Sequence, residues 1–289
     1  SSIMGKVIPC LTTREIEFIQ KQKVFFVATA PLSEKHHVNV SPRSPGSSVV
    51  VVNPTTVMFC DLTGSGSETA AHIHENGRMT LLFVNIEQGP PKILRLHGTA
   101  RILLLPNDDN TNGKQESSLL QQFPKELIQS YGFRAIYELS MDRISTSCGY
   151  SMPVMEFQKY RSTLEEYTSK LGKQGMYDYC TKKNSFSIDG LPSLALMRPG
   201  APKVKPVKED GYIFGHLIND GNEGKEEDEY ENGVVTNHKN KVIFHAQNNN
   251  KDNNNNNNSV NNRWKDMVIV FIVGTVSGTL LREAAYRYH

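Results

Sequence analysis

The chain has 289 residues and a formal net charge of +2, from 32 lysines and arginines against 30 acidic residues. This length allows one large domain or two small ones, and the near balance of charge argues against a dedicated nucleic-acid-binding protein. The four cysteines form no CxxC pair, which excludes a zinc ribbon and a disulfide framework and indicates a reducing compartment. We also expect no secretory signal, because the first residues lack a basic region followed by an apolar run.

Residues 1–200 have the composition of a folded domain rich in β-strands. Their apolar runs are dominated by Val, Ile, Thr and Phe and are bounded by Pro, Gly or Asn, as is typical of strands. Such runs, closely spaced and with few helices between them, predict a mainly β barrel or sandwich with peripheral helices. The expected strands are 24–30, 38–41, 48–53, 56–61, 78–85, 92–105 and 135–149.

Helical signals are fewer than strand signals. A capping box at Thr12–Glu15 predicts a helix that begins near residue 13. Segment 115–131 has helical composition but is interrupted by Pro124, and apolar residues at helical spacing predict a further helix over 156–173.

Residues 201–263 are expected to be a disordered linker. The segment combines prolines and lysines at 199–208, an acidic run at 222–231 and eleven asparagines within 248–262. Such a composition cannot bury enough apolar surface to offset the entropy lost on ordering, so a flexible spacer is the simplest interpretation.

The segment 61–69, Asp-Leu-Thr-Gly-Ser-Gly-Ser-Glu-Thr, leads from an expected strand into an expected short helix. A loop rich in glycine and hydroxyl groups at a helix N-terminus can offer backbone N–H groups and a favourable dipole to an anion. A capped turn without a ligand explains the same residues, and Glu68 opposes a nearby phosphate. The candidate side chains are Thr63, Ser65, Ser67 and Thr69.

A second candidate lies at 41–43, where an expected strand ends in Ser41-Pro42-Arg43. The guanidinium of Arg43 could bind a phosphate in bidentate fashion, although an ordinary solvated arginine fits the pattern equally. No histidine series has metal-ligand spacing, so no metal site is predicted. Cys148 is expected to be a buried thiol, and no catalytic residue can be named.

Five motifs occur in order between residues 12 and 195, and together they resemble the pyridoxamine 5′-phosphate oxidase-like, FMN-binding split-barrel family. They are Ser41–Arg43, Asp61–Thr69, Leu81–Phe83, Leu94–Ala100 and the pair formed by Thr146–Pro153 with Asn184–Pro192. The resemblance implies a six-stranded antiparallel Greek-key split barrel, a homodimer, and FMN bound at the subunit interface. It also implies that Ser41 and Arg43 approach the flavin and that Thr63, Ser65, Ser67 and Thr69 meet its phosphate.

The function implied by the resemblance is a flavin-dependent oxidoreductase acting on a small substrate. The chain lacks the Arg and Lys that true pyridoxamine phosphate oxidases place in the second loop, and we find no match to their substrate site, so we expect a different substrate. A split barrel without catalysis that serves as a binding or scaffold protein stays open as the alternative, as do F420 or haem in place of FMN.

Residues 264–289 form an apolar tail with basic flanks. The uncharged run 267–281 would reach about 22 Å as a helix, short of the roughly 30 Å hydrocarbon core. Aromatic and basic flanks could complete a membrane anchor, which would place the barrel on the cytosolic face of an intracellular membrane. The alternative is a helix docked on the barrel of a cytoplasmic protein.

Overall fold

The computed structural model describes residues 5–44, 48–103, 120–198 and 200–218, together with the backbone of 230–231 and 234–235. The chain divides into a unit of residues 1–227 and a second unit of residues 228–289. In the second unit, the described part is β11 (Tyr230–Glu231) paired antiparallel with β12 (Val234–Val235).

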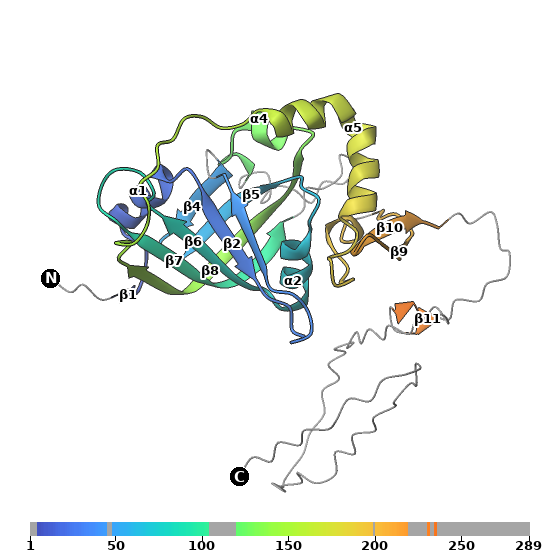
Figure 1. Ribbon diagram of the computed structural model, residues 1–289, viewed down its shortest axis with the longest axis horizontal. Coiled ribbons are helices and arrows are strands. Elements are labelled where there is room, and N and C mark those ends of the chain that lie inside the picture. Colours follow the sequence, from blue (N-terminus) through green and yellow to red (C-terminus); the bar gives the residue numbers. More distant parts are fainter. Residues whose placement is uncertain are drawn as a thin grey trace, which may run out of the picture. The chain divides into compact units, whose positions relative to one another are not determined.

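The first unit is built on one antiparallel sheet of eight described strands, with few helices around it (Figure 1). The strand order is β3-β2-β6-β7-β8-β5-β4, and β1 pairs with β8. The arrangement fits a split barrel, and β1 is the strand that the sequence did not predict. The strands are β1 (Lys6–Ile8), β2 (Phe25–Thr29), β3 (Asn39–Arg43), β4 (Val49–Asn53), β5 (Thr56–Leu62), β6 (Arg78–Val84), β7 (Ile93–Leu103) and β8 (Phe133–Ser147).

The core of this unit is a cluster of aliphatic and aromatic side chains, and four aromatic rings contact one another inside it. The ring centroids of Phe25 and Phe83 lie 5.3 Å apart, those of Phe25 and Phe59 lie 5.4 Å apart, and those of Phe59 and Tyr137 lie 5.2 Å apart. Along β2 the odd-numbered residues 25, 27 and 29 are buried and alternate with less buried residues, whereas the central residues of β5 are buried on both faces. Alternation along β2 therefore marks the inward face of the sheet.

Two helices lie where the sequence predicted them. They are α1 (Thr13–Lys21) and α2 (Glu68–Asn76). The hydroxyl of Thr12 donates to Glu15 over 2.5 Å, so the expected capping residues do contact each other. In the segment 115–131, which has helical composition, the residues after Pro124 form the short helix α4 (Lys125–Ile128).

The helix expected over 156–173 is displaced toward the C-terminus. The structure has α5 at Thr163–Lys183, with a kink at Gly172, whose φ is 64°. Residues 153–162 form neither helix nor strand. Phe157 and Tyr160 instead contact each other, with ring centroids 4.8 Å apart. Two apolar side chains three residues apart can contact each other in an irregular segment as well as on a helix. The spacing alone therefore could not distinguish the two structures.

The prediction of a disordered linker over 201–263 is wrong for its first part, because residues after 200 form a hairpin of β9 (Val204–Glu209) and β10 (Tyr212–Leu217). Asp210 and Gly211 join the two strands with φ values of 49° and 83°. Positive φ at both central residues is the geometry that an Asp-Gly turn favours in hairpins. The composition argument missed this two-residue signal.

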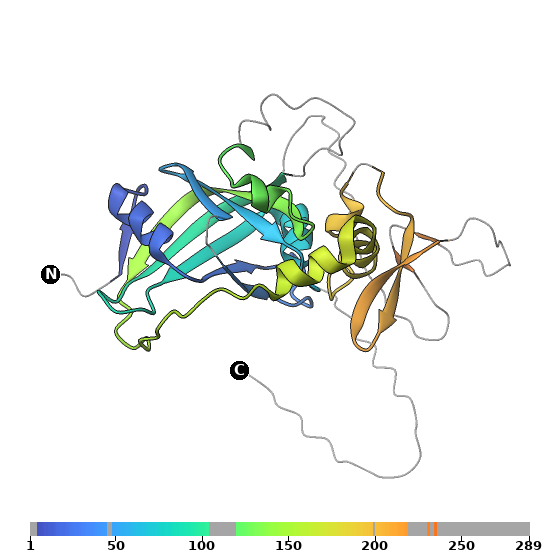
Figure 2. The ribbon, with the colours of Figure 1, turned by 90° about the horizontal axis from the view of Figure 1, so that it is seen from above.

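The hairpin packs on α5, as both ribbon views show (Figures 1 and 2). A Cβ added at Gly215 would lie 2.5 Å from the carbonyl oxygen of Thr181, so only glycine permits this approach. A 3-10 turn, η2 (Leu194–Leu196), precedes the hairpin.

In the described residues, no helix has the length and apolar character needed to cross a membrane. The predicted anchor at 264–289 and the asparagine-rich tract lie outside the described residues.

Candidate functional site

A buried cluster of two arginines and one aspartate lies at the end of β5. Asp61 is fully buried, and its Oδ2 accepts a hydrogen bond from Nε of Arg134 on β8 over 2.7 Å. Its Oδ1 lies 3.1 Å from Nη1 of Arg43, at the end of β3. Burial by itself would lower the pKa of Arg134, but the charge and hydrogen bond of Asp61, together with Tyr137 and Cys180, outweigh burial and raise it. The cluster therefore carries one more positive than negative charge.

The excess charge of the cluster belongs to Arg43. Arg134 alone neutralises Asp61, and its side chain is only 3% exposed, whereas that of Arg43 is 20% exposed. The Nε of Arg43 is buried and has no hydrogen-bond partner in the described part of the chain. Because this Nε is buried, an anionic group could reach only the exposed part of the Arg43 guanidinium.

Arg134 also shapes the loop between β5 and α2. Its Nη1 donates to the carbonyl oxygens of Gly64 and Gly66 and to Oδ1 of Asn184, over 3.3, 3.0 and 3.1 Å. The Nδ2 of Asn184 donates to the same carbonyl of Gly64 over 3.0 Å. The loop therefore turns these carbonyl groups inward.

Three of the predicted hydroxyl residues in this loop are buried and bonded within the protein. Thr63 donates to the carbonyl of Gly132 over 3.0 Å, and Ser67 donates to that of Phe186 over 3.4 Å. Thr69 accepts from the amide of Asn39 over 3.1 Å. These side chains position the loop, and among the four only Ser65 is exposed.

Ser41 belongs to a polar chain that links β3 to α2. Its hydroxyl donates to Oδ1 of Asn39 over 3.0 Å, and Nδ2 of Asn39 donates to Thr69 and, over 3.2 Å, to Thr29. Oγ1 of Thr29 lies 3.0 Å from Nδ1 of the fully buried His72. The structure thus joins Ser41 with Thr69, places Arg43 two residues further along β3, and leaves Ser65 apart from them.

A pocket of about 280 Å³ lies beside the loop. Ser65, Gly66 and Glu68 line one side of it, and the start of β3 lines another. Its apolar wall comes from the segment after α5 and from β10, and it includes Phe186, Ile188, Tyr212 and Phe214. Glu68 and Lys183 are its opposite charges, so the pocket is not strongly cationic.

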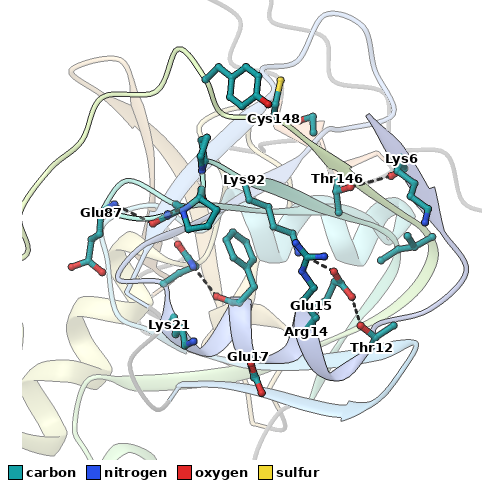
Figure 3. A pocket seen from close by; sticks show the side chains of 18 of the residues that line it. Lys6, Thr12, Arg14, Glu15, Glu17, Lys21, Glu87, Lys92, Thr146 and Cys148 are labelled. Atoms are coloured by element: carbon teal, nitrogen blue, oxygen red, sulfur yellow. Dashed lines mark hydrogen bonds and ion pairs between the residues drawn. The ribbon is translucent and has the colours of Figure 1, made fainter. Parts of the chain in front are cut away.

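Figure 3 shows a larger pocket of about 930 Å³ next to α1, and none of the six predicted residues lines it. Its central charges are already paired, since Nζ of Lys92 lies 2.8 Å from Oε1 of Glu15. Burial would raise the pKa of Glu15, but the hydrogen bonds from Lys92 and Thr12 outweigh burial and lower it. Cys148 also lines this pocket and is exposed, so the expectation of a buried thiol is wrong.

The third pocket, of about 1030 Å³, lies under the irregular segment 153–162. Ser44 and Leu62, each one residue beyond a residue of the arginine cluster, line its inner side. Phe157 and Tyr160 line its outer side, so the ends of β3 and β5 face an apolar cavity of ligand size.

Sequence reasoning missed Arg134, which organises the whole loop, and the pair formed by His37 and Asp189. The sequence held a signal for the pair of His37 and Asp189, since Asp189 lies in the motif Asn184–Pro192. Arg134 had none, because it is 73 residues from Asp61 and occupies one position of a long strand. No group of three potential metal ligands occurs in the described residues.

Comparisons with known proteins agree with the arrangement of motifs. A family model described as Pyridoxamine 5′-phosphate oxidase matches residues 12–126. The Pyridoxamine 5′-phosphate oxidase family protein ustO of Aspergillus flavus is 35% identical over 188 residues, which cover 60% of this chain and 72% of that protein.

Solved structures similar to the chain include two bacterial proteins. HupZ of Group A Streptococcus is 21% identical, with a TM-score of 0.35, over 46% of this chain and 92% of that chain. A protein described as a FAD binding protein of Mycobacterium smegmatis is 14% identical, with a TM-score of 0.30, over 48% of this chain and 96% of that chain. The motif order, the antiparallel sheet and the relative from Aspergillus flavus together establish that this chain belongs to the pyridoxamine 5′-phosphate oxidase family.

Proposed function

We propose that this protein binds FMN and acts as a flavin-dependent oxidoreductase on a small substrate other than pyridoxamine phosphate. Members of the family usually bind a flavin. The observation in this chain that carries the proposal is the excess cation of the arginine cluster. Arg43 is partly exposed and is not needed to neutralise Asp61.

The donor groups of this chain fit an anionic cofactor. In the proposal, Arg43 binds the phosphate with the exposed part of its guanidinium and Ser41, on the same strand, adds a hydroxyl. Ser65, at the exposed tip of the loop, lies apart from these two residues and lines the neighbouring pocket, so it is given no contact to this phosphate. Thr63, Ser67 and Thr69, which the resemblance implied as direct contacts, hold the loop in shape through the bonds that they make inside the protein.

The flavin would supply the redox step by accepting or donating a hydride. The protein's own task is to orient the cofactor and exclude water from it. The apolar cavity beside Ser44 and Leu62 offers the space and the aromatic wall for this task.

The proposal is tested by the absorbance spectrum and FMN affinity of the purified full-length chain, with FMN fluorescence quenching as the binding signal. Arg43→Ala should weaken FMN binding at least about tenfold, as expected for the loss of one charge-assisted hydrogen bond. Arg101→Ala is the matched control, because Arg101 is exposed and pairs with Glu138 away from the cluster. A colourless protein that does not bind added FMN would overturn the proposal in favour of the scaffold alternative, and a Soret band would indicate haem.

We further propose that the protein is a homodimer, since family members are often dimeric. Val40 and Pro42 are exposed on the edge strand β3. Light scattering after gel filtration measures the mass. A monomeric mass at all concentrations would contradict a dimer with the flavin at its interface.

The membrane tether is a separate proposal about the tail. We propose that residues 264–289 hold the protein on the cytosolic face of an intracellular membrane, and that the chain without them is cytoplasmic. Deletion of these residues should move the protein from the membrane fraction to the supernatant. Membrane association that resists alkali after the deletion would contradict the proposal that these residues form the tether.

A further inference from the structure

His37 and Asp189 form a close pair that neither the family relation nor the predicted site assigns. The backbone N–H of His37 donates to Oδ2 of Asp189 over 2.8 Å, and Nδ1 of His37 donates to Oδ1 over 2.7 Å. The two residues are 152 positions apart, in the loop before β3 and in the turn after α5. Both carboxylate oxygens therefore clamp one residue.

The clamp fixes the protonation pattern of the imidazole. A carboxylate only accepts hydrogen bonds, so Nδ1 carries the proton and the lone pair of a neutral ring lies on Nε2. The side chain of Asp189 is 7% exposed and that of His37 is 72% exposed. A buried carboxylate behind an accessible imidazole is the arrangement that makes histidine an oriented base.

Asp189 is itself held in place by its own turn. Its backbone N–H donates to the hydroxyl of Ser187 over 3.2 Å, and the same hydroxyl accepts from the N–H of Leu191 over 3.1 Å. Ser187 is fully buried. The carboxylate is therefore a rigid support for the ring.

His37 lines the pocket of about 280 Å³ together with Asn39 and Ser65. Glu68 from α2 and Lys183 from α5 are the other charged groups of this pocket, and the aromatic residues of β10 form its far wall. Lys183 lies 3.8 Å from the centroid of the Phe214 ring, which holds the ammonium against the wall. The pocket thus offers an oriented base, amide and hydroxyl groups and one charge of each sign to a small ligand.

We infer that His37 is a proton-transfer residue for a small, largely apolar ligand bound in this pocket, and that Asp189 is its positioning residue. The ligand's O–H, N–H or activated C–H bond breaks, the electron pair stays on the ligand, and the proton goes to Nε2. The reverse transfer returns it. The step needs no flavin, so it stands apart from the proposed cofactor.

A proton-transfer probe tests the inference on the full-length chain without FMN. With 5-nitrobenzisoxazole, a base removes one C–H proton while the N–O bond breaks, and the phenolate product is coloured. We expect wild-type protein to exceed the rate of free imidazole at equal concentration by roughly 10²-fold, the range of a positioned base.

His37→Gln should reduce this rate at least about tenfold, because the amide can still donate to Asp189 but is not a base. The matched control is His36→Gln, the preceding residue, which should keep the wild-type rate. A wild-type rate equal to that of free imidazole, or an unchanged rate in His37→Gln, would overturn the inference and leave the pair as a tie between two loops.

Nitrogen chemical shifts of the His37 ring test the role of Asp189 independently of any rate. Wild-type protein should show the tautomer with the proton on Nδ1, and Asp189→Ala should lose that preference. A tautomer that does not change in Asp189→Ala would contradict the positioning role.

Discussion

Arg134 donates to Asp61 over 2.7 Å where both side chains are buried, and this pair connects the sheet to the loop before α2. The guanidinium also bonds two loop carbonyls and Asn184, so one side chain fixes three segments. It neutralises Asp61 by itself and thereby leaves Arg43 available. The candidate cofactor site depends on this division between the two arginines.

Replacing Arg134 should destabilise the fold strongly. Arg134→Met leaves the carboxylate of Asp61 without its buried guanidinium partner, and breaking a buried pair costs about 3–5 kcal/mol of the free energy of unfolding. Urea denaturation measures the loss. Arg101→Met should cost less than about 1 kcal/mol, because its pair with Glu138 is at the surface. Equal losses in the two variants would contradict the structural role of Arg134.

Gly98 should not tolerate a side chain. A Cβ at this position would lie 2.0 Å from the carbonyl oxygen of Ser140, at the irregularity in register between β7 and β8. Gly98→Ala should therefore lower the free energy of unfolding by more than about 1 kcal/mol, since the backbone must shift. Gly64→Ala is the control, because nothing lies within 4 Å of its added Cβ. An unchanged free energy of unfolding in Gly98→Ala would contradict the close approach of β7 and β8 at this position.

Acid should destabilise the protein partly through His72. Burial lowers the pKa of His72 and outweighs the opposing attraction of Glu75, Glu68 and Asp189. Between the folded and unfolded pKa values the unfolded chain binds the proton more readily, so stability falls as the pH drops below about 6.5.

Thermal unfolding at pH 7 and pH 5 should show a smaller difference in His72→Asn than in wild type. Part of the difference should persist, because burial also lowers the pKa of His97. His74→Asn, at an exposed position, should keep the wild-type pH dependence. If His72→Asn keeps the wild-type pH dependence, protonation of His72 does not contribute to the loss of stability in acid.

The hairpin β9–β10 should detach from α5 when Gly215 gains a side chain. The added Cβ of Gly215→Ala would clash with Thr181 and with Ser185, whose Oγ would lie 2.7 Å away. Backbone amides of the hairpin should then exchange with deuterium at least about tenfold faster. Leu217→Ala, on the same strand but 61% exposed, should leave exchange unchanged. Unaltered protection in Gly215→Ala would mean that the contact does not hold the hairpin.

The sequence determined strands β2 to β8 and the family of this protein. Runs of Val, Ile, Thr and Phe bounded by Pro, Gly or Asn placed these strands, because each run depends mainly on its own residues. The order of the motifs likewise identified the loop between β5 and α2 as part of a candidate site. The Asp210-Gly211 turn was equally local, and composition concealed it.

Only the tertiary structure decided what the site residues do. Whether Thr63 and Ser67 face a ligand or a carbonyl depends on Gly132 and Phe186, which lie 69 and 119 residues away. The charge of Arg43 is not needed for Asp61 because Arg134 neutralises that carboxylate. The ring of His37 is oriented by Asp189. Long-range pairs of this kind leave no periodic trace in one sequence, because each partner is a single polar residue whose meaning comes from the chain that folds against it.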